Sequence, residues 1–263
     1  MLRGRLFQPA LLYFRPFAAG ARKFPRVYRG FLYLFSPKNG LSIMLQRSTL
    51  KFLKDLKLNN NKAWFDENRA SYLQAKEDFE SLVQQIIDGL ARMDAGMEGL
   101  TVKECVFRIY KDVRFSKDKT PYKANMGASF SKGGKKSPLA GFYFHLEPGG
   151  HSFAGGGLWM PAPPALKKVR QEIDYNFADF QRIVGAKDFI RLFGKVNGDS
   201  LKTAPQGYHE DNPAIAYLKL KSWVVTTHVS DEAATQPTLV RDVLRIFSTM
   251  QPFIGFLNAA QDE

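Results

Sequence analysis

The spacing of apolar residues between positions 62 and 93 constrains the fold more than any other feature of the chain. Apolar side chains recur there at intervals of three, four and seven, which is the period of one helix face. Gly96 and Gly99 follow and favour a helix end. The sequence therefore predicts one long helix with one buried stripe. The stripe comprises Trp64, Phe65, Tyr72, Ala75, Phe79, Leu82, Val83, Ile86, Ile87, Leu90 and Met93.

Short segments with strand-like alternation follow this helix. Their connections are too short for crossover helices, so the strands should form one mainly antiparallel sheet. The last two read as a hairpin around Pro148, Gly149 and Gly150. We expect these four strands over residues 102–115, 124–131, 139–147 and 151–159.

The remaining elements are helices and one later strand. Helices, then consecutive strands, then helices are typical of an α+β fold. We therefore expect a mainly antiparallel sheet packed against the long N-terminal helix and C-terminal helices. The other helices are expected over residues 50–58, 165–175, 177–184, 189–196 and 239–257, the last bent near Pro252, with a strand inside 216–229.

The most charged strand-like segment is residues 108–123, which read R-I-Y-K-D-V-R-F-S-K-D-K-T-P-Y-K. Side chains alternate between the two faces of a strand. If residues 107–115 form a strand, its apolar face can pack on a core, while the other face carries Arg108, Tyr110, Asp112 and Arg114. Such a charged face is either a solvated surface or a site that holds an anion.

We interpret this segment as an anion site, because Arg offers a planar fork and Lys a point charge to an oxyanion. Arg108 and Arg114 would lie roughly 20 Å apart on a strand, so a compact site would use Arg114 with Lys117 or Lys119. The candidate ligand-binding residues are Arg108, Arg114, Lys117, Lys119 and Lys123, and the candidate acids and bases are Asp112, Asp118 and Tyr122.

Three functions fit these residues. The first is an enzyme that acts on a phosphorylated or otherwise anionic substrate. The second is a non-catalytic module that binds a nucleotide or nucleic acid. The third is a salt-bridge network that only fixes the turn. A cluster of mixed-sign charges in a closed pocket would favour the enzyme, and an open basic stripe with exposed aromatic residues would favour nucleic acid.

The other motifs indicate neither a metal site nor a particular cofactor. Residues 155–157 are three glycines, but they lack the phosphate-loop and dinucleotide-binding patterns, so we expect a strand that needs glycine. No two histidines have zinc-site spacing. His145 should share a strand face with Tyr143 and Glu147, where we expect a solvated or hydrogen-bonded histidine.

Five separated motifs resemble the uncharacterised, mostly bacterial family called domain of unknown function 2461. The resemblance covers about residues 49–257 and implies no particular activity, cofactor or substrate. Members of that family generally begin near Met44, and arginine is more usual at the position of Lys111. The motifs are the charged segment at 108–123, N-N-N-K-A-W-F-D-E-N-R at 59–69, G-G-G-L-W-M-P at 155–161, L-K-T-A-P-Q-G-Y at 201–208 and L-K-L-K-S-W at 218–223.

The formal net charge of +13 is concentrated at the N-terminus. Residues 1–47 contain nine Lys or Arg and no acidic residue, which leaves 29 basic against 25 acidic residues in the rest of the chain. The charge therefore argues little for nucleic acid as a partner. We expect residues 1–43 to form an extension that adds nothing to the fold, and residues 44–263 to form a single α+β domain.

Residues 1–43 are rich in arginine and aromatic residues. They are compatible with a transit peptide, with a membrane-surface segment, or with translated sequence upstream of a start at Met44, and we favour the third interpretation. No apolar run approaches the ~18 residues of a membrane span. The one cysteine, Cys105, excludes an intrachain disulfide and fits a reducing compartment, so we expect a cytoplasmic protein.

Overall fold

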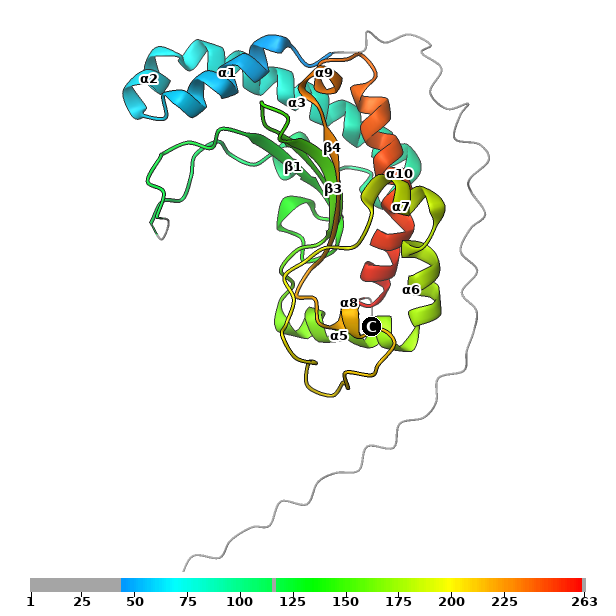
Figure 1. The fold of residues 1–263 in the computed structure, drawn as a ribbon. Coiled ribbons are helices and arrows are strands. Elements are labelled where there is room, and N and C mark those ends of the chain that lie inside the picture. Colours follow the sequence, from blue (N-terminus) through cyan, green and yellow to red (C-terminus); the bar gives the residue numbers. More distant parts are fainter. Residues whose placement is uncertain (1–43, 115–116, 262–263) are drawn as a thin grey trace, which may run out of the picture. The chain divides into compact units, whose positions relative to one another are not determined.

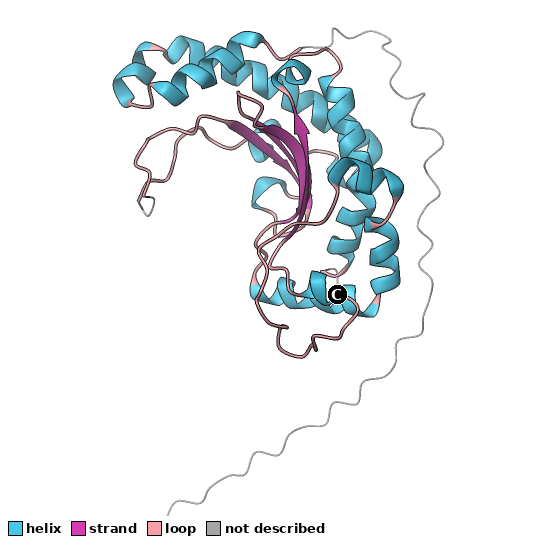
Figure 2. Cartoon of the chain, viewed as in Figure 1, coloured by secondary structure: helices cyan, strands magenta, loops and turns pink. Residues whose placement is uncertain are grey.

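The computed structural model describes residues 44–114 and 117–261 of the 263-residue chain. The predictions about residues 1–43 concern a part of the chain outside the described residues. The described part has an α+β fold, in which helices precede, cover and follow a four-stranded antiparallel sheet (Figure 1, Figure 2). The predicted fold class is confirmed. No helix in these two ranges is both long and apolar enough to cross a membrane.

The sheet follows the order of the sequence, β1-β2-β3-β4, and each neighbouring pair is antiparallel. β2 and β3 form the predicted hairpin. Its turn places Gly149 and Gly150 at φ values of 85° and 74°, a backbone region in which other residues are strained. The strands are β1 (Met126–Phe130), β2 (Gly141–Leu146), β3 (Ser152–Leu158) and β4 (Trp223–Val229).

The predicted strand at residues 102–115 is wrong. Its first part is a short helix, α4 (Val102–Cys105), because Thr101 and Glu104 form a capping box: the Thr101 backbone N–H donates to Glu104 Oε2 over 2.9 Å. The next residues are extended but make only isolated bridges, such as Tyr110 to Tyr122. The fourth strand of the sheet is instead β4, which pairs with β3.

Segments outside the strands contact both edges of the sheet. At the β1 edge, the Phe107 backbone N–H donates to the Gly127 carbonyl over 3.0 Å. At the β4 edge, Asn197 and Val224 exchange two backbone hydrogen bonds of 2.8 and 2.9 Å. Neither edge is therefore a bare row of unpaired backbone groups.

Two long helices, α3 (Arg69–Met93) and α10 (Leu239–Ala259), cover one face of the sheet (Figure 1). Phe144 of β2 stacks with Phe79 of α3 at a ring-centroid distance of 6.4 Å. Phe142, two residues earlier on the same strand, stacks with Phe247 of α10 at 4.9 Å. Aromatic pairs of this kind contribute beyond their buried area, so this layer is the main core.

The predicted helix over residues 62–93 is divided into α2 (Lys62–Glu67) and α3. The break is at Asn68, whose φ and ψ of −100° and 18° depart from helical values. Its side-chain amide donates to the Trp64 carbonyl over 2.9 Å, which satisfies a carbonyl at the end of α2. The preceding helix, α1 (Arg47–Leu58), packs against α3.

The C-terminal half of the chain supplies the remaining helices. The predicted segments over 165–175, 177–184 and 189–196 correspond to three helices here. Their bounds, with those of the short elements, are α5 (Pro163–Tyr175), α6 (Phe177–Val184), α7 (Lys187–Phe193), α8 (Ile215–Leu218) and α9 (Asp231–Ala234), with 3₁₀ turns η2 (Ala95–Met97) and η3 (Gly134–Lys136).

Two glycine-to-alanine substitutions should have opposite effects on stability. A Cβ at Gly156 would lie 2.5 Å from the Gly141 carbonyl oxygen and 2.8 Å from Met250 Sδ, so Gly156→Ala should lower the free energy of unfolding by about 1–3 kcal/mol. A Cβ at Gly255, within α10, meets nothing within 4 Å, so Gly255→Ala should raise it by about 0.4–1 kcal/mol. Urea denaturation measures both values, and equal effects would contradict the packing described for β3.

Candidate functional site

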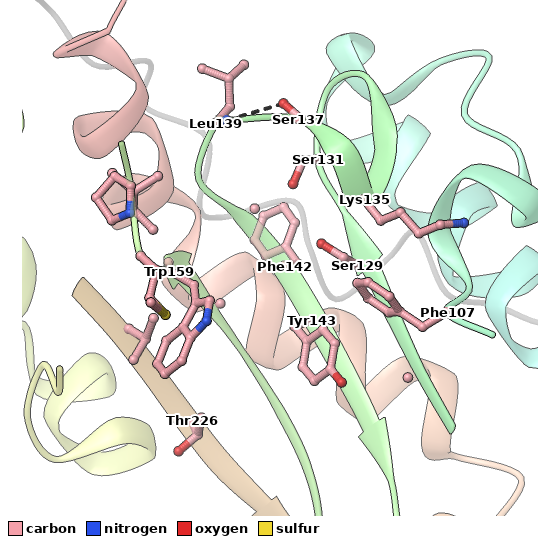
Figure 3. A pocket seen from close by; sticks show the side chains of 18 of the residues that line it. Phe107, Ser129, Ser131, Lys135, Ser137, Leu139, Phe142, Tyr143, Trp159 and Thr226 are labelled. Atoms are coloured by element: carbon pink, nitrogen blue, oxygen red, sulfur yellow. Dashed lines mark hydrogen bonds between the residues drawn. The ribbon is translucent and has the colours of Figure 1, made fainter. Parts of the chain in front are cut away.

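The face of the sheet opposite α3 and α10 lines a cavity of about 800 Å³. Side chains alternate along a strand, so the register that points Phe142 and Phe144 at the helices points Tyr143 at this cavity. The other strands contribute Ser129 and Thr226 (Figure 3), and Phe153 of β3 is also among the lining residues.

Glycines make room on this face. A Cβ at Gly127 would lie 2.4 Å from Tyr143 Oη, and a Cβ at Gly157 would lie 2.0 Å from the Trp223 carbonyl oxygen. Gly157 also has a φ of 131°, which other residues rarely adopt. The glycines at 155–157 thus belong to strand β3 rather than to a phosphate loop, as predicted. Gly127 thus leaves room for the Tyr143 hydroxyl, and Gly157 lets β3 lie close to β4.

Aromatic side chains flank this hollow. Figure 3 shows Tyr143 between Phe107 and Trp159, and Phe107 meets Tyr143 edge-on at 6.2 Å between ring centroids. Trp159 is 68% exposed. The next residue, Met160, has a φ of 43°, and its backbone N–H donates to Ser222 Oγ over 2.9 Å. A non-glycine residue in this region of backbone space is strained, and this one lies at the cavity rim.

The charged side chains among the described lining residues are all cationic: Arg108, Lys123 and Lys135. The Lys135 ammonium is already hydrogen bonded to the backbone: its Nζ donates to the carbonyls of Lys103 and Val106 over 2.5 and 2.7 Å. Burial lowers the pKa of Lys123, and the nearby Arg108 guanidinium lowers it further. The Lys123 Nζ lies 5.6 Å from the Phe107 ring centroid, which is a cation–π contact.

A family model described as "Conserved hypothetical protein (DUF2461)" matches residues 48–256. The chain belongs to the DUF2461 family. The predicted family is therefore confirmed. Comparison with curated proteins gives no match, and comparison with solved structures gives none either.

Three of the five motifs that suggested DUF2461 lie at or beside the cavity. The segment 108–123 contributes Arg108 and Lys123 to the lining, and the segment 155–161 contributes residues 156–161. In the segment 218–223, Ser222 accepts the hydrogen bond from the Met160 backbone that fixes the rim. These three motifs therefore meet around one hollow in the sheet.

The predicted site residues divide into two groups in the DUF2461 fold. Arg108 and Lys123 line the cavity and lie on adjacent segments, because the Lys123 backbone N–H donates to the Ile109 carbonyl over 2.8 Å. The other predicted residues are not among its described lining residues. They are Arg114, Lys117, Lys119, Asp112, Asp118 and Tyr122.

The turn between these segments is held by exposed ion pairs. Arg114 donates to both carboxylate oxygens of Asp112 over 2.9 and 2.7 Å, which lowers the pKa of Asp112. Lys111 Nζ lies 2.6 Å from Asp118 Oδ2 and lowers the pKa of that carboxyl strongly. Lys119 donates to the Val113 carbonyl over 3.0 Å. These contacts match the structural interpretation of the turn.

Tyr122 is buried at the base of the turn, with 4% of its surface exposed. Its ring stacks on Phe65 of α2 at 3.9 Å, and burial raises the pKa of its phenol. The Asn60 side chain accepts from the Tyr122 backbone N–H over 3.1 Å and donates to its carbonyl over 2.9 Å. Tyr122 thus anchors the charged segment to α2 and keeps Lys123 beside the sheet.

Sequence reasoning missed most of the cavity. It did not select Tyr143, Phe153 or Trp159, although it placed Tyr143, His145 and Glu147 on one strand face. The structure confirms that shared face, and His145 is hydrogen bonded to both neighbours. A usable signal was the small residues in β1 and β3, which leave space beside the aromatic ones. Within the described residues, no group of three His, Cys, Asp or Glu side chains is placed to hold a metal ion.

The anchor of the turn should matter more to stability than its surface ion pairs. Asn60→Ala removes both hydrogen bonds to the half-buried backbone of Tyr122 and should cost about 1–3 kcal/mol of unfolding free energy. Arg114→Ala, the matched control in the exposed turn, should leave the melting temperature within about 2 °C of the parent. Thermal unfolding by circular dichroism measures both, and a larger loss for Arg114→Ala would show that the turn carries the fold.

Proposed function

We propose that this cavity binds a small anionic molecule that also has an aromatic or apolar part. The observation that carries the proposal is the presence of Arg108 and Lys123 in a hollow whose described lining residues include no acidic side chain. An anion there would meet two cations and no opposing carboxylate from that lining. The proposal moves the predicted anion site from Arg114 to Arg108.

The energetics of Lys123 support an anion as the missing partner. Burial disfavours the charged form of this lysine, and the neighbouring Arg108 adds like-charge repulsion. A bound anion would offset both costs, because it supplies the opposite charge in a partly dehydrated place. Arg108 can add a planar, two-point contact to the same phosphate or carboxylate group.

The size and lining of the cavity favour a small molecule over a polymer. Ligand cavities of about 300–1,000 Å³ typically enclose drug-sized molecules, and this cavity measures about 800 Å³. Phe107, Tyr143 and Phe153 offer ring faces or edges to an apolar body. The hydroxyls of Ser129 and Thr226 can fix its orientation.

One observation favours a second candidate, single-stranded nucleic acid. Trp159 stands 68% exposed at the rim, and exposed aromatic residues beside cations are typical of base-stacking surfaces. A tetranucleotide that binds much more tightly than its mononucleotide would favour this second function.

Loss of either cavity cation should weaken anion binding selectively. We expect Arg108→Gln and Lys123→Gln to weaken binding of AMP and naphthalene-2-sulfonate by roughly tenfold or more, because each removes a charge-assisted contact. Arg114→Gln, in the exposed turn, serves as the matched control and should leave affinity nearly unchanged. Isothermal titration calorimetry at fixed ionic strength measures the affinities.

Two results would contradict this proposal. If Arg114→Gln weakens binding as much as Arg108→Gln, the anion binds at the exposed turn and not in the cavity. The absence of binding by either probe and by the tetranucleotide would remove the proposed function.

Binding should also depend on pH through Lys123. Its pKa is lowered from the usual 10.5, so its charge is lost as pH rises through that lowered pKa, while Arg108 stays charged. The affinity for naphthalene-2-sulfonate, whose own charge does not change, should therefore fall before about pH 10.5. By the same linkage, the ligand-free protein should gain stability over that interval, because the unfolded chain then binds more protons.

The control for this pH dependence is Lys123→Gln. In that variant the residual affinity should be nearly flat over the same interval. An affinity of the parent that stays constant from neutral pH to about pH 10 would show that Lys123 does not contact the anion.

A further inference from the structure

Three polar side chains at alternate positions, Tyr143 and His145 on β2 and Glu147 directly after it, form a hydrogen-bonded row beside the cavity. His145 Nε2 lies 3.1 Å from Glu147 Oε2, and His145 Nδ1 lies 3.3 Å from Tyr143 Oη. Lys57 of α1 closes the row, with its Nζ 3.1 Å from Glu147 Oε1. Tyr143, at the other end, is a cavity-lining residue.

Glu147 sets the direction of proton donation at one end of the row. Burial alone would raise the pKa of Glu147, but hydrogen bonds from His145 and Lys57 lower it overall, so this carboxylate is ionised and can only accept. The Nε2 atom of His145 therefore carries the proton that it donates to Glu147. In the neutral imidazole, the unprotonated Nδ1 faces the phenol of Tyr143 and can accept its proton.

Packing holds these groups in place. The His145 ring stacks on Phe153 with centroids 4.7 Å apart and an interplanar angle of 11°. Gly127, on the adjacent strand, leaves the space that the Tyr143 hydroxyl needs, since a Cβ there would lie 2.4 Å from it. His145 itself is only 14% exposed, so water competes little with its two partners.

This order of groups is that of an activated nucleophile: a hydroxyl, a histidine base and a carboxylate that orients the base. Burial raises the pKa of the Tyr143 phenol, so the phenol stays protonated near neutral pH and needs a base in order to react. We propose that Tyr143 is a nucleophile toward the anion held in this cavity, with His145 as its base and Glu147 as the positioning residue. The inference rests on the proposed anion site.

The reaction that suits these groups is transfer of a phosphoryl group from an activated phosphate. The phenolic oxygen attacks phosphorus, the bond from phosphorus to the leaving oxygen breaks, and that oxygen keeps the electron pair. The phenolic proton passes to His145 Nδ1 and from there to the leaving oxygen. Arg108 and Lys123 counter the negative charge of the transferred group. Phe107 meets Tyr143 edge-on, and the Lys123 Nζ lies 5.6 Å from the centroid of the same ring, so the cation and the nucleophile share one aromatic neighbour.

Two sulfonyl fluorides test the nucleophile without a known substrate. Benzenesulfonyl fluoride is neutral, and 4-(fluorosulfonyl)benzoate carries an anionic group. With either probe, the tyrosine oxygen attacks sulfur, fluoride leaves with the electron pair, and a stable sulfonate ester remains. Peptide mapping by mass spectrometry gives the rate at Tyr143 and, as an internal reference, at Tyr175, which is 68% exposed.

We expect Tyr143 to react faster than Tyr175 although it is less exposed. His145→Gln should slow the reaction of Tyr143 by roughly tenfold or more with both probes, because it removes the base. Glu147→Gln should slow it less and leave Tyr175 unchanged. Tyr143→Phe should remove the product. Arg108→Gln should slow only the anionic probe.

The outcomes separate the two proposals. If Tyr143 reacts no faster than Tyr175 and His145→Gln leaves its rate unchanged, the nucleophile is refuted. A different result is a rate at Tyr143 that depends on His145 but is the same for both probes and unaffected by Arg108→Gln. That result would support Tyr143 as a nucleophile and contradict the proposed anion site. The reference rate at Tyr175 shows in each variant whether the fold is intact, and Glu147→Gln gives a second measurement if His145→Gln does not fold.

Discussion

Phe142 and Phe144 fix the sheet against its helices, where they stack with Phe247 of α10 and Phe79 of α3. Because strand side chains alternate, this packing also decides what the opposite face presents. A shift of one residue in the register of β2 would bury Tyr143 and His145 and expose the phenylalanines. The core and the cavity are therefore two results of one register, and the stability of the core maintains the geometry of the candidate site.

The position of the cationic wall depends on a different contact. Tyr122 stacks on Phe65 and is held along its backbone by Asn60. Without a regular strand in this segment, these contacts and the hydrogen bond from the Lys123 backbone N–H to the Ile109 carbonyl set where the cations lie. The exposed ion pairs lie farther out in the segment, whereas the aromatic anchor determines whether Arg108 and Lys123 reach the sheet.

Much of the fold could be predicted from local patterns. The hairpin turn at Gly149 and Gly150, the apolar stripe of α3 and the helices after β3 each follow from spacing within one segment. The α4 helix was also encoded locally, in the capping box of Thr101 and Glu104, but the apolar alternation that follows it favoured a strand. The pairing of β4 with β3 joins segments far apart in the chain, and no local pattern specifies it.

The site was harder to predict because its shape depends on glycines, which have no side chain, and on contacts between residues far apart in the sequence. Strand spacing predicted that Arg108 and Arg114 lie too far apart to serve one small anion, but the segment is not a regular strand. The spacing could not indicate which of them lies in a hollow, since that depends on the anchor at Tyr122. The cavity floor depends on glycines such as Gly127 and Gly157, whose role emerges only when their neighbours across the sheet are known.

The segments at the two sheet edges have a consequence for how this protein can meet others. Many proteins recruit an extended peptide as an extra strand, through free backbone groups at a sheet edge. Here the Phe107 backbone N–H is already hydrogen bonded to the Gly127 carbonyl of β1. At the other edge, Asn197 is hydrogen bonded to both the backbone N–H and the carbonyl of Val224 on β4. A peptide that extended the sheet beyond β1 would displace Phe107 and, with it, one wall of the cavity. Strand addition at that edge and an intact cavity are therefore mutually exclusive.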